Sequence, residues 1–278
     1  KGRMMMNKIY ISADIEGIWG NVNSAYTMPG VPEYEQYRRR MIDEVNIVAQ
    51  TLFKYGIQEI LVNDGHGNMD NLLPEDLDPR VRLVCSQGAF KENGMMEGIS
   101  AEFDGACFIG YHCRSNTPGI MAHTMWGTMI RSVSLNGEEI GESGLNAHLA
   151  WHHGVPVILV SGDSLLKEQL DDELHGQFRY VQTKEVINSA AAINCSHDEL
   201  VRQYEREIRQ TLDAHHEIYP EDGYVMDITF HKEKNADFVA RMPEIQRIAP
   251  CTVRIEGSDY AKVYRLMRFI IKVCNAFV

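Results

Sequence analysis

The sequence lacks the long apolar runs and the compositional bias of membrane, fibrous or disordered proteins. Its 278 residues contain no stretch of 18 consecutive apolar residues, so no transmembrane helix is expected. The segment from Lys1 to Met6 is too short and too polar for a signal peptide, from which we expect a cytoplasmic protein. Hydrophobic residues make up 44% of the chain and charged residues 24%, a balance that predicts a globular fold.

Positive charge is scarce as well. The chain has 27 lysines and arginines against 39 aspartates and glutamates, which gives a formal net charge of −12. The run Arg38-Arg39-Arg40 lies between acidic residues on a predicted helix, where intrahelical charge pairing explains it better than phosphate binding. A nucleic acid or an anionic membrane surface is therefore not expected as a partner.

Motifs for several kinds of chemistry are absent. No P-loop motif is present and no G-x-G-x-x-G follows the first predicted strand, so nucleotide binding has no support. The G-x-S-x-G elbow of serine hydrolases is also missing. The cysteines form no C-x-x-C pair and lie in or beside apolar stretches, so we expect them to be reduced packing residues: Cys85, Cys107, Cys113, Cys195, Cys251 and Cys274.

The pattern that is present alternates short β-branched runs with amphipathic helical stretches, as in βαβ units. Strands are predicted at Lys8 to Ala13, Glu59 to Asn63, Val81 to Val84, Ala106 to Gly110, Val157 to Val160 and Tyr180 to Thr183. Helices are predicted at Glu33 to Tyr55, Gly144 to His153 and Ser196 to His216. The predicted fold is α/β, with a mostly parallel, doubly wound sheet and helices on both of its faces.

Two features interrupt this series. Asn136-Gly137, between apolar residues that alternate, predicts a hairpin inserted at about residues 128–140. From Gly223 the order becomes strand, helix, strand, helix, at Tyr224 to Phe230, Ala236 to Met242, Thr252 to Glu256 and Tyr260 to Ala276. This order predicts a catalytic α/β domain over residues 6–219 and a smaller α+β module over residues 223–278.

Four side chains suited to metal binding follow predicted strands. Asp14 and Glu16 come after the first strand, His66 after the second and His112 after the fourth. In a parallel sheet all of these strand ends meet at one edge, so the side chains are expected to converge. Asp14 and Glu16 are separated by one residue, which places both on the same face of an extended backbone.

The expected donor set is carboxylate oxygen and imidazole nitrogen without thiolate. This set favours Zn²⁺, with Mn²⁺, Co²⁺ or Ni²⁺ as substitutes. A carboxylate flanked by further ligands, here Asp14, could bridge two ions about 3.5–4 Å apart. Asp64, two residues before His66, is expected to accept a hydrogen bond from the His66 imidazole and fix its tautomer.

Five segments occur in an order that is found in a known family. They are Ser-Ala-Asp-Ile-Glu-Gly (12–17), Asn-Asp-Gly-His-Gly (63–67), Gly-Tyr-His (110–112), Thr-Pro-Gly-Ile-Met-Ala-His (117–123) and Gly-Glu-Ser-Gly-Leu-Asn-Ala (141–147). Together they resemble the DppA family of zinc-dependent D-aminopeptidases. The resemblance extends from Lys8 to about Asp163 and continues more loosely to the C-terminus.

The resemblance implies an aminopeptidase that acts on short peptides with N-terminal D-residues such as D-Ala. It implies two Zn²⁺ per subunit, a catalytic histidine at His123, and a homodecamer of two stacked five-membered rings. The zinc ligands that it implies are Asp14, Glu16, His66, His112 and Glu142. Without the resemblance, Glu142 is explained equally well as an acidic residue in the first turn of a helix, where the helix dipole stabilises negative charge. The role of His123 as nucleophile, proton carrier or oxyanion partner stays open.

Other readings of the same residues remain. A dinuclear metallophosphoesterase or amidohydrolase would use a similar centre on another substrate, and a non-catalytic peptide-binding protein would use the metals structurally. His148 and His152 have the spacing of a zinc motif, but Leu149 stands where the catalytic glutamate would be, so both are expected to be non-catalytic. Three further histidines, His153, His215 and His216, are expected to be structural, and Asp163 is first a candidate helix cap.

Overall fold

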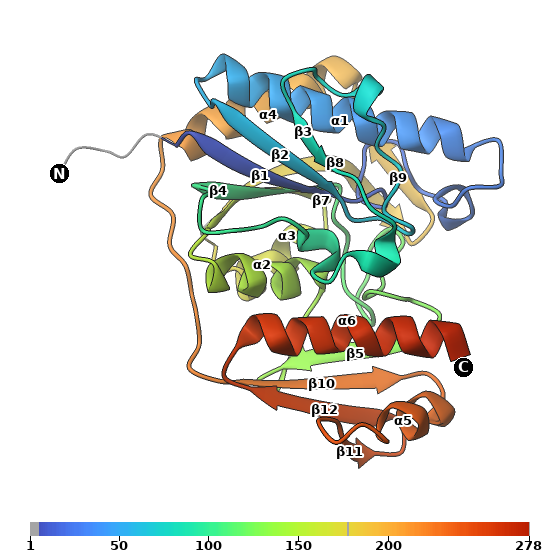
Figure 1. Cartoon of the computed structure of the whole chain (residues 1–278). Helices are drawn as coiled ribbons and strands as arrows, with labels where there is room; N and C mark the ends of the chain where they lie inside the picture. The colour runs from blue at the N-terminus through green and yellow to red at the C-terminus, as the bar shows by residue number, and fades with distance from the viewer. Residues whose placement is uncertain (1–5, 177, 278) are drawn as a thin grey trace.

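Two β-sheets organise the part of the chain that the computed structural model describes, residues 6–176 and 178–277 (Figure 1). One sheet has seven strands in the order β3-β2-β1-β4-β7-β8-β9, and the other has five in the order β11-β12-β10-β5-β6. Residues 1–5, which make up most of the N-terminal segment Lys1 to Met6 considered above, lie outside the described residues. The seven-stranded sheet lies within the predicted α/β part, whereas the five-stranded sheet combines β10, β11 and β12 with β5 and β6.

The seven-stranded sheet is parallel except for its last strand. Its strands are β1 (Lys8–Ala13), β2 (Glu59–Asp64), β3 (Arg82–Val84), β4 (Gly105–Ile109), β7 (Val157–Asp163), β8 (Arg179–Asn188) and β9 (Ala191–Asn194). Only β9 runs antiparallel, against β8. The central strands β1, β4 and β7 are buried along almost their whole length. Burial on both faces explains why these strands are nearly continuous apolar runs in the sequence.

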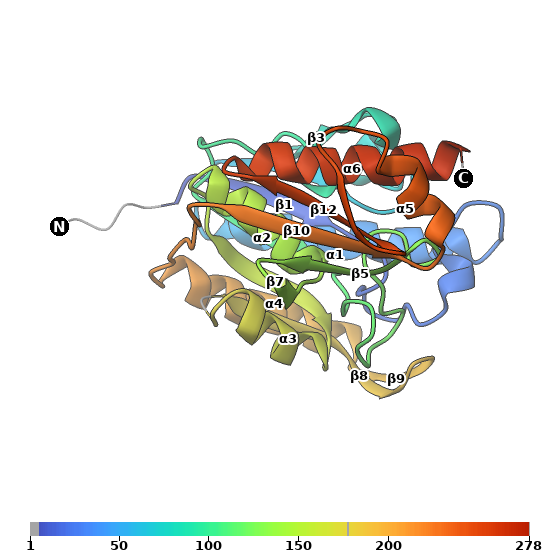
Figure 2. The same ribbon diagram turned by 90° about the horizontal axis from the view of Figure 1, so that it is seen from below.

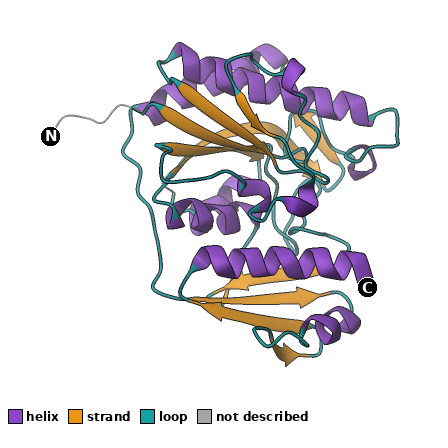
Figure 3. Ribbon diagram, in the orientation of Figure 1, coloured by secondary structure: helices purple, strands orange, loops and turns teal. Residues whose placement is uncertain are grey.

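Helices cover both faces of this sheet, as predicted (Figure 3). One face packs against α1 (Tyr34–Lys54) and α4 (His197–Leu212), and the other faces α2 (Glu142–His152) and α3 (Leu166–Glu173). Helix α4 begins at a side-chain N-cap, in which the Ser196 hydroxyl accepts a hydrogen bond from the Glu199 backbone N–H. In the described parts of the chain, no helix combines the length and apolarity needed to cross a bilayer.

The five-stranded sheet forms a second layer against α6 (Tyr260–Phe277). Its strands are β5 (Ile130–Leu135), β6 (Glu138–Glu139), β10 (Tyr224–Phe230), β11 (Gln246–Ala249) and β12 (Thr252–Gly257), with α5 (Glu233–Val239) between β10 and β11. Strands β12, β10 and β5 lie side by side across this layer (Figure 2). Every second residue of β10 is buried, the pattern of a sheet with one covered face. Helix α6 lies between this sheet and α2 (Figure 1).

The hairpin β5–β6 has the predicted Asn136-Gly137 turn, with both residues at positive φ, 52° and 94°. Its strand β5 pairs with β10, not with the parallel sheet. The five-stranded sheet therefore takes strands from both of the predicted units. Sequence periodicity identifies a hairpin but does not show which sheet the hairpin joins. The division of the chain into two units at residues 219–223 stays a prediction.

Short 3₁₀ segments occur in the connections, at η1 (Ser24–Tyr26), η2 (Pro74–Asp76), η3 (Gly88–Phe90) and η4 (Gly94–Met96). Segment η4 lies against the ends of β1 and β2, where Ser12 and Asn63 donate side-chain hydrogen bonds to Met95 and Gly94 carbonyls. The cysteines are free thiols, and three of them, Cys107, Cys113 and Cys274, are buried as packing residues. The same expectation was wrong for Cys85, which is exposed. The packing of η4 fixes the strand ends from which the candidate site is built.

Candidate metal centre

Six side chains from five segments meet at the carboxyl edge of the parallel sheet. They are Asp14, Glu16, His66, His112, His123 and Glu142. Strand β1 lies between β2 and β4, so the loops that follow these three strands are neighbours. Five of the side chains are almost fully buried, whereas a quarter of the His123 side chain is exposed. The structure thus brings together every residue that the sequence assigned to the site.

The first cluster consists of Asp14, Glu16 and His66. The Nδ1 atom of His66 lies 3.3 Å from Asp14 Oδ1 and 3.0 Å from Glu16 Oε2. The Nε2 atom lies 2.8 Å from the Thr27 carbonyl oxygen, which can only accept, so Nε2 carries the proton and donates. Nδ1 faces the two carboxylates, and an imidazole that gives up its Nδ1 proton in this arrangement can bind a cation.

The expectation that Asp64 would accept from the His66 imidazole was wrong. Asp64 instead accepts backbone N–H groups of His66, Asn71 and Leu72, and the Asn71 side-chain amide. A short carboxylate at a strand end reaches the amides of its own loop more easily than a ring that points away from it. Asp64 therefore shapes the loop, while the Thr27 carbonyl fixes the imidazole.

The second cluster consists of His112, His123 and Glu142. His112 Nε2 lies 3.4 Å from Glu142 Oε1, and its Nδ1 donates to the Cys113 carbonyl at 2.9 Å. His123 stacks on His112, with ring centroids 4.1 Å apart and an interplanar angle of 11°. Its Nε2 lies 3.7 Å from Glu142 Oε1, and its Nδ1 donates to the Met121 carbonyl at 2.8 Å. Both free Nε2 atoms therefore face Glu142.

Asp14 connects the two clusters. Its Oδ1 faces His66 Nδ1 at 3.3 Å, and its Oδ2 faces His112 Nε2 at 3.4 Å. One carboxylate thus offers a separate oxygen to each imidazole. This is the geometry of a carboxylate shared between two cations.

Two buried atoms of the site lack hydrogen-bond partners. They are Glu16 Oε2 and His112 Nε2. Glu16 Oε2 lies 3.0 Å from His66 Nδ1, the ring nitrogen that faces the carboxylates. Buried polar atoms without partners are rare and costly. Both atoms face neighbouring ligand atoms, so cations held between them would satisfy both, and the residues fit a dinuclear metal site.

The pKa shifts in the site also indicate that a bound cation would be stabilised there. Burial alone would lower the pKa of His112, but the carboxylates of Glu142 and Asp14 override it and raise that pKa to about 10. Burial and the neighbouring Glu16 carboxylate raise the pKa of Asp14 to about 7. Burial acts against the charged form of Glu16, yet His66 holds the Glu16 pKa well below its usual range. The crowded carboxylates are thus stabilised by any cation placed among them.

The loop that carries Glu16 is held by a buried lysine. Lys184, 1% exposed, donates to the carbonyls of Glu16, Ile18 and Asn21 at 2.6, 2.8 and 2.6 Å. In the same loop a β-carbon on Gly17 would lie 1.9 Å from the Tyr111 carbonyl oxygen, so only glycine allows the two ligand loops to touch. These contacts fix the position of Glu16 before any metal binds.

Replacing Lys184 with methionine is expected to destabilise the fold and weaken metal binding. The change leaves three buried carbonyls without donors, which should lower the free energy of unfolding by about 2–4 kcal/mol. Chemical denaturation and zinc titration measure the two effects. Lys167→Met is the matched control, because Lys167 is exposed and contacts the Asp171 carboxylate and the Phe178 ring, not backbone carbonyls of the site. Equal stability of the two variants would show that Lys184 does not hold the loop.

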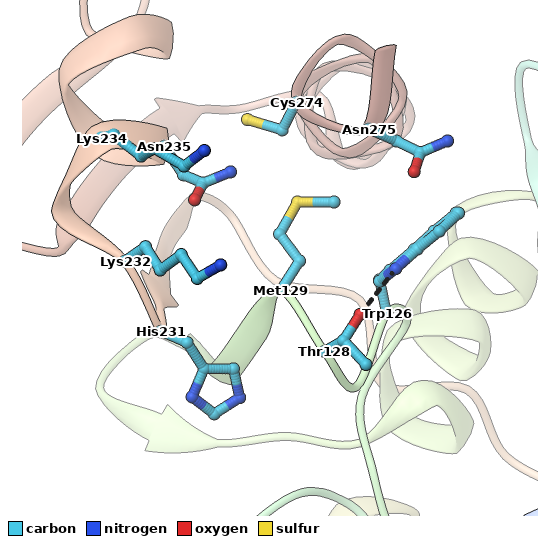
Figure 4. A pocket seen from close by; sticks show the side chains of 9 residues that line it. All are labelled: Trp126, Thr128, Met129, His231, Lys232, Lys234, Asn235, Cys274 and Asn275. Atoms are coloured by element: carbon cyan, nitrogen blue, oxygen red, sulfur yellow. Dashed lines mark hydrogen bonds between the residues drawn. The ribbon is translucent and has the colours of Figure 1, made fainter. Parts of the chain in front are cut away.

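A cavity of about 540 Å³ opens over the centre. Metal-facing residues line one side of it, and methionines with Trp126 line much of the remainder. Arg268 and Lys272 of α6 line it as well. A smaller hollow of about 160 Å³ adjoins it and shares Trp126, Thr128 and Asn275 (Figure 4). The larger cavity has the size and the mixed lining of a small-molecule site.

The other residues singled out in the sequence lie outside the centre. Asp163 caps α3, since its Oδ1 accepts from the backbone N–H groups of Leu165 and Leu166, and its Oδ2 accepts from Ile120 in the loop that leads to His123. His148 is buried beside the rings of Trp151, Tyr224 and Tyr260. Burial lowers the pKa of His148 to about 4, as expected for a neutral core residue.

Sequence reasoning missed two parts of the site. The Thr27 carbonyl that orients His66 belongs to a loop without any recognisable motif. The α6 side chains Arg268 and Lys272 are spaced i, i+4, which suggested only an amphipathic helix. The sequence signal for Arg268 and Lys272 is that both cationic residues lie beside apolar positions of this helix that are buried.

Comparison with known proteins gives one consistent result. The sequence profile of the D-aminopeptidase family matches residues 6–269. A D-aminopeptidase of Bacillus subtilis (strain 168) is 33% identical over 266 residues, which cover 94% of this chain and 95% of that protein. The solved structure of the Zn-dependent D-aminopeptidase DppA from Bacillus subtilis, a self-compartmentalizing protease, superposes with a TM-score of 0.90 at 31% identity. That match covers 96% of this chain and 97% of the other.

Proposed function

The chain belongs to the D-aminopeptidase family and is a zinc-dependent metallopeptidase, and on this premise we propose that it cleaves short peptides at an N-terminal D-residue in a two-zinc centre. The single observation that carries the proposal is the position of Asp14, whose two oxygens face His66 and His112 at 3.3 and 3.4 Å. The cavity above it is large enough for a small peptide.

The proposed ligands divide into two sets that share Asp14. Asp14, Glu16 and His66 would hold one ion, and Asp14, His112 and Glu142 would hold the other. Imidazole nitrogen with carboxylate oxygen is a donor set that suits Zn²⁺. When bound, zinc would polarise the scissile carbonyl and make a water molecule more acidic. Glu142 also accepts the backbone N–H of Met125 at 2.6 Å, which fixes its carboxylate beside His112.

His123 is proposed as the catalytic residue. Its Nδ1 is committed to the Met121 carbonyl, so its Nε2 is the atom available to the cavity. The side chain is partly exposed while the proposed ligands are buried, as expected for a group that meets substrate. From this position Nε2 can accept a proton or donate one to an oxygen that becomes negatively charged during the reaction.

The substrate assay separates the proposal from its alternatives. Release of D-Ala from D-Ala-D-Ala without turnover of p-nitrophenyl phosphate supports a D-aminopeptidase, and the reverse result would support a phosphoesterase. Bound zinc without any turnover would support a peptide-binding protein. The family assignment does not favour the phosphoesterase, amidohydrolase or peptide-binding alternatives.

We propose that the chain assembles into a homodecamer of two stacked pentameric rings that encloses the active sites, in the cytoplasm. Support comes from the resemblance to the DppA family and from the related structure, a self-compartmentalizing protease. Light scattering after size exclusion should therefore give a mass about ten times that of the 31.6 kDa chain. A monodisperse monomer at micromolar concentration would rule out the ring.

A further inference from the structure

One wall of the active-site cavity carries positive charge that the proposed mechanism does not use. Arg268 and Lys272 lie one turn apart on α6 and line the same cavity as Asp14, His123 and Glu142. Arg268 is only 8% exposed. Across residues 6–176 and 178–277, neither cation forms an ion pair with a carboxylate. The cavity therefore has a metal centre on one side and a cationic side chain on the other.

The guanidinium of Arg268 is buried without its usual partners. Its Nε and Nη2 atoms have no hydrogen-bond partner. A buried charged group that is neither paired nor hydrogen-bonded costs stability, so it is retained where it serves a ligand. Burial and the nearby Arg268 charge lower the pKa of Lys272, which also indicates positive charge without compensation.

The fold makes room for this arginine and holds it in place. Gly94, at φ 53°, lies against the guanidinium, and a β-carbon there would be 2.5 Å from Arg268 Nε. One turn earlier on α6, the Tyr264 hydroxyl donates to Asn146 Oδ1 of α2 at 2.7 Å. Helix α2 begins at Glu142, so this bond ties the cationic wall to the helix that carries a proposed zinc ligand. The distance between wall and centre is thus set by packing.

We propose that Arg268, assisted by Lys272, binds the C-terminal carboxylate of the peptide substrate and so selects short peptides with a free C-terminus. A planar guanidinium matches a carboxylate with two parallel hydrogen bonds, which no neutral side chain supplies. The N-terminal residue then lies at the metal centre and the carboxylate at α6, and the cavity between them limits peptide length. The inference rests on the proposed function and names its substrate class.

The test compares D-Ala-D-Ala with its C-terminal amide, which lacks the negative charge. The zinc-loaded wild type is expected to prefer the free acid in kcat/KM by about 10- to 100-fold, the range for losing a hydrogen bond to a charged group. Arg268→Met should remove this preference by lowering kcat/KM for the acid and leaving the amide within about threefold. Arg268→Lys keeps the charge and should restore part of the preference.

Two matched variants test the position of the subsite. Arg265 lies on the same helix but is exposed and bonds to Asn93, and Lys232 lines the adjoining hollow (Figure 4). Arg265→Met and Lys232→Met should both keep the wild-type ratio of acid to amide. If Lys232→Met loses the preference, the carboxylate lies in the adjoining hollow and our assignment is wrong. Equal losses on acid and amide in Arg268→Met would show a structural role only.

A binding measurement keeps this inference separate from the proposed function. Calorimetry of D-Ala-D-Ala with chelated protein should give a weaker affinity for Arg268→Met, by about 10-fold or more, and no such change for the amide. Turnover by the wild type without preference for the acid overturns the carboxylate subsite alone. Absence of turnover together with acid-selective, Arg268-dependent binding overturns the peptidase function and supports the subsite.

Discussion

Replacing Asp14 with alanine is expected to remove zinc from both positions and to bring peptide hydrolysis below detection. The Asp14 oxygens face the two imidazoles separately, at 3.3 and 3.4 Å, and no other carboxylate of the site lies close to both histidines. Losing this bridge leaves each proposed ion with one carboxylate and one imidazole, too few protein ligands for tight binding. Elemental analysis of the purified variant measures the effect directly.

Glu16→Ala is the matched comparison, because Glu16 belongs to one cluster only. It should lose mainly one ion. Unfolding of the metal-free Asp14→Ala protein controls for structure, and its stability should not fall, since burial and the neighbouring Glu16 carboxylate already raise the pKa of Asp14 to about 7. If Asp14→Ala retains the metal content of the wild type, the bridging assignment is wrong.

Replacing His123 with alanine is expected to lower kcat by roughly 10²-fold or more while the zinc content stays unchanged. The reason is its place in the site, stacked on His112 and partly exposed, with Nε2 available to the cavity. Steady-state kinetics and elemental analysis of the same preparation separate a catalytic role from a ligand role.

The position of His123 also allows a role as a metal ligand. Ligand atoms of His112, His123 and Glu142 all lie within 4.8 Å of one another, so His123 is close enough to contribute to metal binding. Loss of one zinc from His123→Ala would move it from the catalytic residues to the ligands. His231→Ala is the control, because His231 is an exposed histidine of the adjoining hollow that contacts the Gly127 carbonyl. Its kcat and zinc content should match the wild type.

The sequence predicted the parallel sheet well because buried strands have an unmistakable composition. The first strand was placed at Lys8 to Ala13, the same bounds as β1. Strands that are covered on both faces are nearly continuous apolar runs, and polar residues mark the points where they end. The same reasoning located four residues of the site, since parallel strand ends share one edge of the sheet.

The elements that were missed carry no such pattern. Strand β11 (Gln246–Ala249) is exposed at every position, so its sequence has no alternation of apolar and polar residues that would predict a strand. The pairing of β5 is also not predictable, because its contacts with β10 join residues 91 to 100 positions apart. Local periodicity does not contain that information.

Parts of the site were beyond local reasoning for a similar reason. Glu142 is the first residue of α2, where an acid is favoured by the helix dipole whether or not it binds a metal, and only the family resemblance assigned it a role. The contact of His66 with Thr27 joins residues 39 positions apart, and it displaced the expected bond to Asp64. Such contacts depend on how the loops pack after the strands have assembled.

The most direct measurement of the central claim is hydrolysis of matched D-Ala-D-Ala and L-Ala-L-Ala by the chelated and the zinc-reconstituted protein. The account predicts no turnover after chelation, recovery with two zinc ions per chain, and faster cleavage of the D-dipeptide than of the L-dipeptide. Turnover that survives removal of the metal, or equal rates on the two dipeptides, would contradict it.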